Sequence, residues 1–288
     1  MELLTSLAAH PDVVIRHIFR VAVKRYARSI ISRCTAGVLI AIVLPNVALA
    51  TTIVAIIDSD QYKIILGADS LITSFDLQWG QAIGHYRGCK IVVMPDCVAA
   101  TAGLTFSQRF TFDLHRIARR ACTASGDLHD KADTFTEQAL QAVRTLARQI
   151  RKISPAIYGK TFIPGQDIVQ AVFAGVQNRH LSILGRAIFA NETRTIDAKE
   201  FDALTNGPTP SAVLGQSAAI IDYISADPDW NQEDTVNIVK KFLDMEVRAR
   251  PDLVGPPVSI LEIGQDIMSP EQAASKWLMA GACGDGSE

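Results

Sequence analysis

The chain has 288 residues, of which 48% are apolar and 20% charged, so one large core or two small ones can form. The first 50 residues hold one Lys and five Arg against Glu2 and Asp12, a net charge of +4, and the remainder holds 22 basic and 28 acidic residues, a net charge of −6. A mildly acidic body gives no electrostatic reason to expect a nucleic acid as partner.

The segment before Thr51 predicts a removable leader. Basic residues recur every four positions, at Arg16, Arg20, Lys24 and Arg28. An apolar run over 36–44 and the small residues Ala48-Leu49-Ala50 follow, in the order typical of a secretory signal. Cleavage after Ala50 would make Thr51 the new N-terminus. The apolar run is too short to predict a membrane span.

Other interpretations of the leader stay open. It is also compatible with a self-removed propeptide, with a basic helix resting on a membrane, and with a start site assigned too far upstream. We expect a periplasmic or secreted protein if the leader is a signal peptide, and a cytoplasmic one otherwise.

A first hairpin is predicted directly after the leader. A β-branched apolar run over 52–58 is followed by a turn and a second apolar run over 62–68. Counting outward from the turn, Thr51 faces Ala68 and its neighbour Asp69.

A second hairpin joins 90–94 to 97–103 through a Pro-Asp turn, which brings Lys90 beside Thr101 and near Gly103. Each hairpin thus gathers its polar residues at its open end. If the two open ends lie together, one site contains Thr51, Asp69, Lys90 and the backbone of Gly103.

This constellation resembles the proteasome β-type branch of the N-terminal-nucleophile hydrolases, including bacterial proteasome-like peptidases. The matching segments, in the family's order, are Thr51-Thr52 before an apolar strand, Gly67-Ala68-Asp69-Ser70, Lys90-Ile91 and Ala102-Gly103-Leu104. The resemblance covers most of the chain from Thr51 to about Gly264 and is most specific at its front. It implies a threonine whose α-amino group is freed by cleavage, with an aspartate and a lysine behind it.

Amide hydrolysis by an N-terminal threonine requires these residue types. A threonine hydroxyl needs a base, and an N-terminal amine with a pKa of roughly 8 is partly neutral near pH 7, so Thr51 would carry its own base. Lys90 would lower the pKa values of both groups, and Asp69 would hold Lys90 charged. The Gly103 amide would stabilise the oxyanion. Each residue alone has an ordinary structural explanation, but the four together behind a processing site favour catalysis.

Two further residues are weaker candidates. Ser217 follows a predicted strand-to-helix junction where the family keeps a helper serine, although a helix N-cap is an equal explanation. Asp252 resembles the family's Arg-Asp before the last strand, but the family's following serine and paired glycines are replaced by 253–257.

Self-processing proteasome subunits typically have glycine before the threonine, whereas this chain has Ala50, which a signal peptidase accepts.

Downstream periodicity predicts helices, strands and a loop in alternating blocks. The expected elements are helices over 108–124 and 133–153 (the second capped by Asp133), a hairpin of 168–176 and 181–189, a loop over 205–210, helices over 217–226 and 234–250, and a last strand over 258–263. This order predicts an α+β fold, the four-layer α-β-β-α sandwich that the resemblance also implies.

No metal or other cofactor is expected, because the six histidines show no metal-ligand spacing and no phosphate-binding glycine loop is present. The four cysteines that remain after cleavage are scattered and sparse, which favours buried thiols over a disulfide framework. They are Cys89, Cys97, Cys122 and Cys283.

The sequence therefore predicts a leader over 1–50 and a threonine-type endopeptidase domain over 51–288. Expected partners are a peptide or unfolded protein substrate, a signal peptidase for maturation and further copies of the chain in a homo-oligomeric ring, with no nucleic acid and no stable membrane span in the mature form. Two alternatives remain: an N-terminal-nucleophile amidase acting on a small molecule, and a non-catalytic proteasome-like structural subunit that never exposes Thr51.

Overall fold

The computed structural model describes residues 51–75, 82–107, 110–178, 180–201, 211–265 and 273–283. These residues form a mixed α+β fold with two five-stranded and two two-stranded antiparallel sheets. The predicted leader lies outside the described residues. None of the described helices combines the length and the apolar character that crossing a bilayer requires.

The first large sheet carries the strand that follows Thr51. Its strand order is β12 (Ser211–Gly215), β1 (Thr52–Asp58), β2 (Lys63–Ala68), β13 (Ser259–Gln265) and β14 (Ala273–Met279). Side chains of β1 alternate between two apolar clusters: Ile53 and Ala55 face one, Val54 and Ile56 the other. Because both faces of β1 are buried, its sequence is a continuous apolar run.

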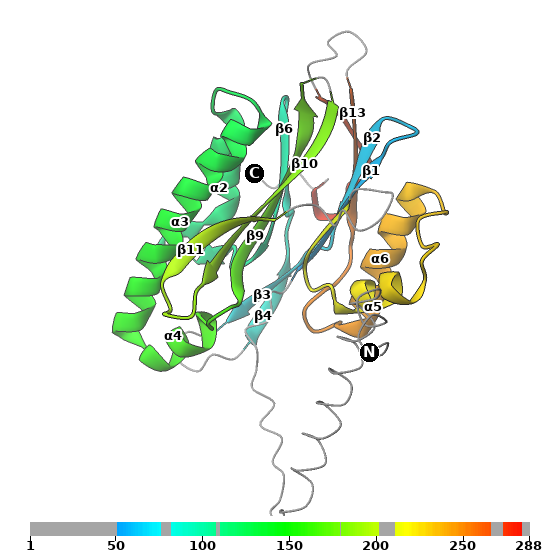
Figure 1. Ribbon diagram of the computed structural model, residues 1–288. Coiled ribbons are helices and arrows are strands. Elements are labelled where there is room, and N and C mark those ends of the chain that lie inside the picture. Colours follow the sequence, from blue (N-terminus) through cyan, green and yellow to red (C-terminus); the bar gives the residue numbers. More distant parts are fainter. Residues whose placement is uncertain are drawn as a thin grey trace, which may run out of the picture. The chain divides into compact units, whose positions relative to one another are not determined.

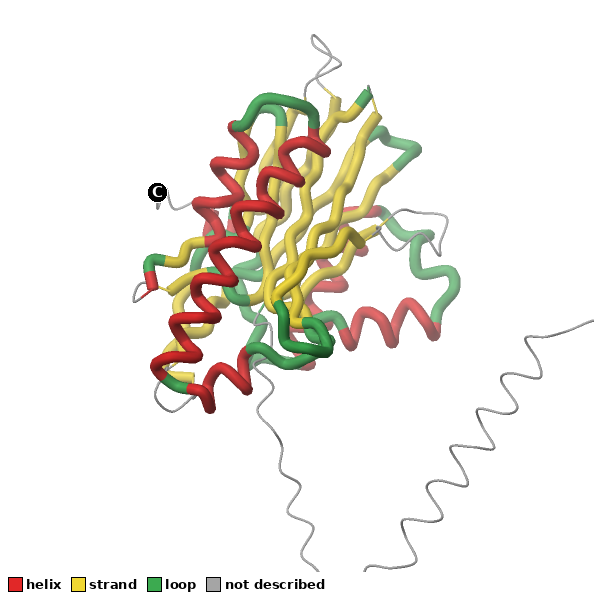
Figure 2. The backbone as a smooth tube through the Cα atoms, turned by 60° about the vertical axis from the view of Figure 1, so that its left-hand side comes forward, coloured by secondary structure: helices red, strands yellow, loops and turns green. Residues whose placement is uncertain are grey.

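The second large sheet has the order β11 (Ile196–Phe201), β10 (His180–Ala190), β9 (Asp167–Gln177), β6 (Cys97–Gly103) and β5 (Ile91–Met94). The helices of the fold are α2 (Leu114–Thr123), α3 (Leu128–Ile153), α4 (Pro155–Thr161), α5 (Ala218–Ala226) and α6 (Thr235–Ala249). Figure 1 shows α2, α3 and α4 on one side of the strands and α5 and α6 on the other, and Figure 2 shows α2 and α3 side by side over the strands.

Three apolar clusters hold these elements together. One joins the two sheets and includes Ile53 and Leu66 from the first and Val172 from the second. Another packs α2, α3 and α4 on the second sheet, with Phe135 against Phe173 at a ring-centroid distance of 5.2 Å. The third packs α5 and α6 on the first sheet. Burial of these side chains is the main favourable contribution to the fold.

The predicted hairpins are confirmed, with one change of register. In the first hairpin Ala68 pairs with Ile53, so the prediction that Thr51 faces Ala68 is wrong by two positions. The connection between β1 and β2 is longer than the two-residue turn that the prediction assumes. Each residue of β2 therefore pairs with a β1 residue two positions closer to the turn. In the second hairpin Ile91 pairs with Ala100, and the Thr101 N–H donates to the Lys90 carbonyl over 3.3 Å, as the sequence predicts.

Two predicted helix starts are wrong. Helix α2 begins at Leu114, because the Asp113 carboxylate accepts from the Arg116 N–H at 2.9 Å and caps it, after a short strand β8 (Phe112–Asp113). Helix α3 begins at Leu128 rather than near Asp133, because Asp127 and Asp130 form a reciprocal capping box. The polar stretch before the periodic apolar residues concealed this earlier start.

Several elements carry no clear sequence signal and were not predicted: β3 (Leu71–Phe75), β4 (Ala82–Arg87), β7 (Phe106–Ser107), β11, β14 and α4. The strand over 258–263 is therefore not the last one. Strand β12 and helix α5 form the strand-to-helix junction predicted before Ser217. The hairpin of 168–176 and 181–189 and the helices over 217–226 and 234–250 are confirmed within one or two residues. The loop predicted over 205–210 lies outside the described residues.

The prediction of buried thiols is wrong. Cys89 is bonded to Cys283, 194 residues away, and Cys97 to Cys122, 25 residues away, with Cα–Cα distances of 4.6 and 5.4 Å. The number and spacing of the cysteines along the chain could not indicate these pairs, because pairing depends on which elements the fold brings close together.

Candidate active site

The candidate nucleophile Thr51 lies directly before β1, against the loop that follows β12. The Gln216 N–H donates to the Thr51 carbonyl at 2.7 Å, and the Thr52 hydroxyl donates to the Gln216 carbonyl at 2.8 Å. Thr51 is 2% exposed and Thr52 is fully buried. The loop after β12 therefore holds the start of β1 through both threonines.

Gly215 allows this close approach. Its φ is +76°, in the left-handed region, and a Cβ added there would lie 1.9 Å from the Thr51 carbonyl oxygen. A residue with a side chain would be strained in that backbone conformation and would displace Thr51.

We therefore expect Gly215→Ala to lower the free energy of unfolding by at least about 1–3 kcal/mol, from the backbone conformation alone, and to move Thr51. Chemical denaturation monitored by circular dichroism measures the change. The matched control is Gly159→Ala in α4, where an added Cβ has no atom within 4 Å, so stability should be unchanged or slightly higher. Equal denaturation midpoints for Gly215→Ala and the parent would contradict this account of the site.

Asp69 connects the start of β1 to the rest of the site. Its carboxylate accepts from the backbone N–H groups of Thr52 at 2.8 Å, Leu71 at 3.0 Å and Gly255 at 3.2 Å. Its side chain is fully buried, and its remaining partner is the Lys90 ammonium at 2.8 Å. Four donors converge on one buried carboxylate, so the negative charge is both compensated and fixed in position.

Lys90 brings a positive charge to the same place. Its side chain is 3% exposed, and Nζ donates to Asp69 and, at 2.6 Å, to the Leu71 carbonyl. Burial lowers the pKa of Lys90 below its ordinary 10.5, and the charge and hydrogen bond of Asp69 oppose that shift. The structure thus brings Thr51, Asp69 and Lys90 to one end of the two hairpins.

Gly103 is the predicted site residue that the second sheet contributes. It is the last residue of β6, pairs with Val169 of β9, and has a φ of +97°, a value suited to glycine. The neighbouring hydrogen bond from Thr101 to Lys90 fixes the end of β6 relative to the lysine.

The two weaker candidates lie at the borders of this site. Ser217 occupies the N-cap position of α5, but its hydroxyl makes no capping bond to the helix, and the buried Glu246 carboxylate accepts from the Ile220 N–H instead. The Asp252 side chain is 63% exposed and pairs with Arg250 at 3.4 Å, and this hydrogen bond lowers the pKa of Asp252. The segment after Asp252 reaches the core of the site through Gly255.

Sequence reasoning missed three backbone contributors: Leu71, Gln216 and Gly255. They act through their peptide groups, so residue type carries almost no information about them. The only sequence signal was their position, two residues after Asp69, directly before Ser217 and three residues after Asp252.

One group of described side chains has the spacing of metal ligands, formed by His129, Asp133 and Glu200. The buried Arg186 guanidinium pairs with Asp133 at 2.8 Å and with Glu200 at 3.3 Å. Because this cation already compensates the carboxylates, the cluster is explained as an ion-pair network between α3 and the second sheet.

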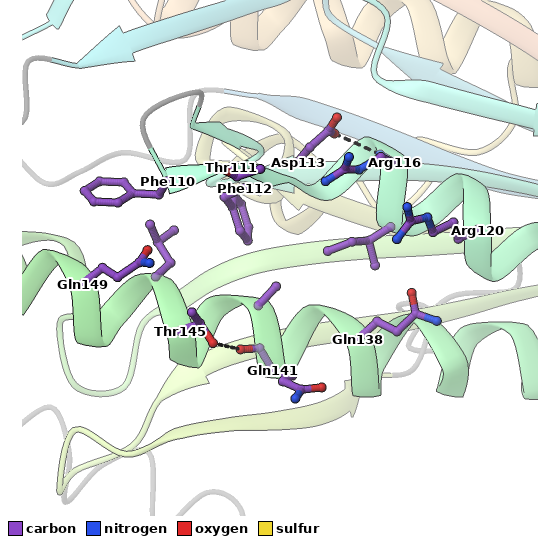
Figure 3. A pocket seen from close by; sticks show the side chains of 13 residues that line it. Phe110, Thr111, Phe112, Asp113, Arg116, Arg120, Gln138, Gln141, Thr145 and Gln149 are labelled. Atoms are coloured by element: carbon purple, nitrogen blue, oxygen red, sulfur yellow. Dashed lines mark hydrogen bonds between the residues drawn. The ribbon is translucent and has the colours of Figure 1, made fainter.

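A pocket of about 570 Å³ lies between the start of α2 and the later turns of α3. Figure 3 shows Phe110 and Phe112 entering it from the segment before α2, with Gln138, Gln141 and Gln149 on the opposite side, on α3. None of the six predicted site residues lines it. The candidate active site is thus separate from this pocket.

No protein-family model matches the chain, and no curated protein matches it in a sequence search. Among solved structures, one similar chain is an Anbu protein, a Gly-1 mutant, from Hyphomicrobium sp. strain MC1. The identity is 14% and the TM-score 0.42, over 80% of this chain and 87% of that chain. The function of this chain is therefore inferred from the residues of the site.

Proposed function

We propose that this protein is a threonine-type peptidase that uses the α-amine and hydroxyl of Thr51 after removal of the residues before it. The observation that carries the proposal is the buried Lys90–Asp69 pair, which is hydrogen-bonded through Asp69 to the Thr52 N–H directly beside Thr51. A buried ion pair contributes little net stability, since desolvation of both charges offsets their attraction. A pair kept at this position is better explained by its effect on the adjacent hydroxyl and amine.

The proposed reaction has two stages. The Thr51 hydroxyl attacks the carbonyl carbon of the substrate amide while its proton passes to the neutral α-amine, and the Lys90 charge favours the deprotonated forms of both groups. A backbone N–H at Gly103 stabilises the oxyanion. The protonated α-amine then gives its proton to the leaving amine, an ester to Thr51 forms, and water hydrolyses the ester to release the acid and regenerate Thr51.

The proposal includes the four-layer α-β-β-α arrangement of N-terminal-nucleophile hydrolases. The three apolar clusters, one between the sheets and one between each sheet and its helices, support it. It also includes a homo-oligomeric ring that limits access to peptides and unfolded chains.

Export is proposed as the route of maturation. Disulfides persist in oxidising compartments, so the bonds Cys89–Cys283 and Cys97–Cys122 support a periplasmic or secreted location. In that location signal peptidase would expose Thr51, and degradation would proceed without ATP.

We expect Ala50→Phe to leave a longer, inactive precursor, because signal peptidase requires a small residue before the cut. Intact-mass analysis of the purified protein measures the N-terminus, and a fluorogenic peptide measures activity. Parent protein beginning at Thr51 together with a mature Thr51→Ala variant would support signal-peptidase cleavage. Failure of Thr51→Ala to mature, with Ala50→Phe tolerated, would indicate self-cleavage. Parent protein that retains all 50 leader residues would contradict the proposed peptidase.

A further inference from the structure

We propose that Gln170 is a positioning residue for the candidate nucleophile, an inference that rests on the proposed function. Gln170 belongs to β9 of the second sheet, where it pairs with Ala102 next to Gly103. Its Oε1 accepts from the N–H of Gly215, which belongs to β12 of the first sheet, at 2.7 Å. One side chain therefore links the two sheets beside the site.

The orientation of this amide is determined by its partners. The Gly215 N–H requires an acceptor, so the Gln170 carbonyl oxygen must face it and the NH₂ group must face the other way. There Nε2 donates to Asp167 Oδ2 at 2.8 Å, and Lys199 pairs with Asp167 Oδ1 at 2.7 Å. The chain of contacts fixes the Gln170 side chain at both ends.

Gly215 transmits this constraint to Thr51. Its Cα lies so close to the Thr51 carbonyl that no Cβ fits, and the next N–H, from Gln216, donates to that same carbonyl. Among the described strands, β12 lies at the edge of its sheet and pairs with β1. Gln170 supplies the second anchor, so loss of its amide should let Gly215 and Gln216 shift together with Thr51. A shift of about 1 Å is enough to cost a large factor in rate.

Gln170→Leu keeps most of the side-chain volume and removes both hydrogen bonds. We expect kcat to fall about tenfold or more with KM nearly unchanged, since a buried N–H is left without its acceptor while the substrate-binding surface is retained. The matched control is Gln177→Leu at the other end of β9, where the side chain bonds Asp127 outside the site, and its kcat should equal that of the parent.

The pH dependence of kcat in Gln170→Glu is a measurement that a change in packing alone would not alter. An ionised glutamate cannot donate to Asp167, and it adds a negative charge beside that carboxylate, whose cationic partner among the described residues is Lys199. A protonated glutamate can still donate. The kcat of the variant divided by that of the parent should therefore be highest at the acidic end of the measurable range and fall as the pH rises.

Amide hydrogen exchange of the segment 211–217 gives a measurement that needs no activity. Faster exchange there in Gln170→Leu, and parent-like exchange in Gln177→Leu, is the expected result. Parent-like exchange in Gln170→Leu would overturn the inference whether or not the protein is a peptidase, and so would faster exchange with an unchanged kcat. Faster exchange in a protein whose parent form hydrolyses no peptide would refute the proposed function while leaving the anchoring of Gly215 supported.

Discussion

Thr51→Ala is expected to abolish amide hydrolysis, by more than about 10³-fold, while the protein stays folded. The Thr51 backbone carbonyl that accepts from Gln216 remains in the variant, and Thr51 belongs to none of the three apolar clusters. The substitution removes the attacking oxygen and the γ-methyl group and keeps the backbone unchanged. Thr51→Ser keeps that oxygen and should retain part of the rate.

The measurement is hydrolysis of a fluorogenic peptide by protein whose N-terminus has been verified by mass as residue 51. Thr235→Ala is the matched control, because this buried hydroxyl donates to Asp58 at 2.9 Å, away from the site. That variant should lose about 1 kcal/mol of stability and keep the parent rate. Undiminished hydrolysis by Thr51→Ala would exclude Thr51 as the nucleophile and remove the basis of the proposed mechanism.

Lys90→Met should reduce kcat by about 10²–10³-fold, the range found when one group that stabilises charge at a reaction centre is removed. Methionine has a similar length and no charge, so the hydroxyl and amine of Thr51 lose the neighbouring cation. We expect a stability loss of about 3 kcal/mol, the lower end for a broken buried pair, because three backbone N–H groups still bond Asp69.

Substitution of a second buried lysine distinguishes an effect on catalysis from an effect on stability. Lys131 has a side chain that is 6% exposed, and its carboxylate partner Asp96 lies 4.0 Å away and is half exposed. Lys131→Met should change stability modestly and leave kcat unchanged. If both lysine variants kept the parent kcat, the Lys90–Asp69 pair would be purely structural.

The pH dependence of stability provides an independent check on Lys90. Burial lowers its pKa in the folded state below the ordinary 10.5, so between the two values the unfolded chain binds more protons than the folded one. The contribution of Lys90 to the free energy of unfolding therefore rises with pH through that window. The difference in stability between the parent and Lys90→Met should grow in the same direction, and a difference independent of pH would contradict the burial of a titrating amine.

Local patterns in the sequence were enough to predict the central features of the site. Alternating or continuous apolar runs bounded by turns predict both hairpins, and the hairpins bring Asp69 and Lys90 toward Thr51. Even with the first register wrong by two positions, the pair is found, because a hairpin's open end gathers the same few residues for any turn of similar length.

Helix starts were harder to predict from the sequence, because they depend on which of several polar residues caps the helix. Asp127 competes with Asp130 and Asp133, which look equivalent in the sequence, and Asp113 lies inside the apolar periodicity that begins at Phe110. Strands β3, β4, β11 and β14 contain polar residues that interrupt their apolar pattern, and they form because a neighbouring strand supplies partners for their backbone groups.

The sequence by itself thus determined that two hairpins would bring Thr51, Asp69 and Lys90 together. Only the tertiary structure decided what holds them there. The backbone N–H groups of Leu71 and Gly255 on Asp69, the approach of Gly215 to Thr51 and the Gln170 amide all join residues far apart in the chain. Peptide groups are the same at every position, so contacts made through them leave no mark on residue type and appear only when the two sheets are packed together.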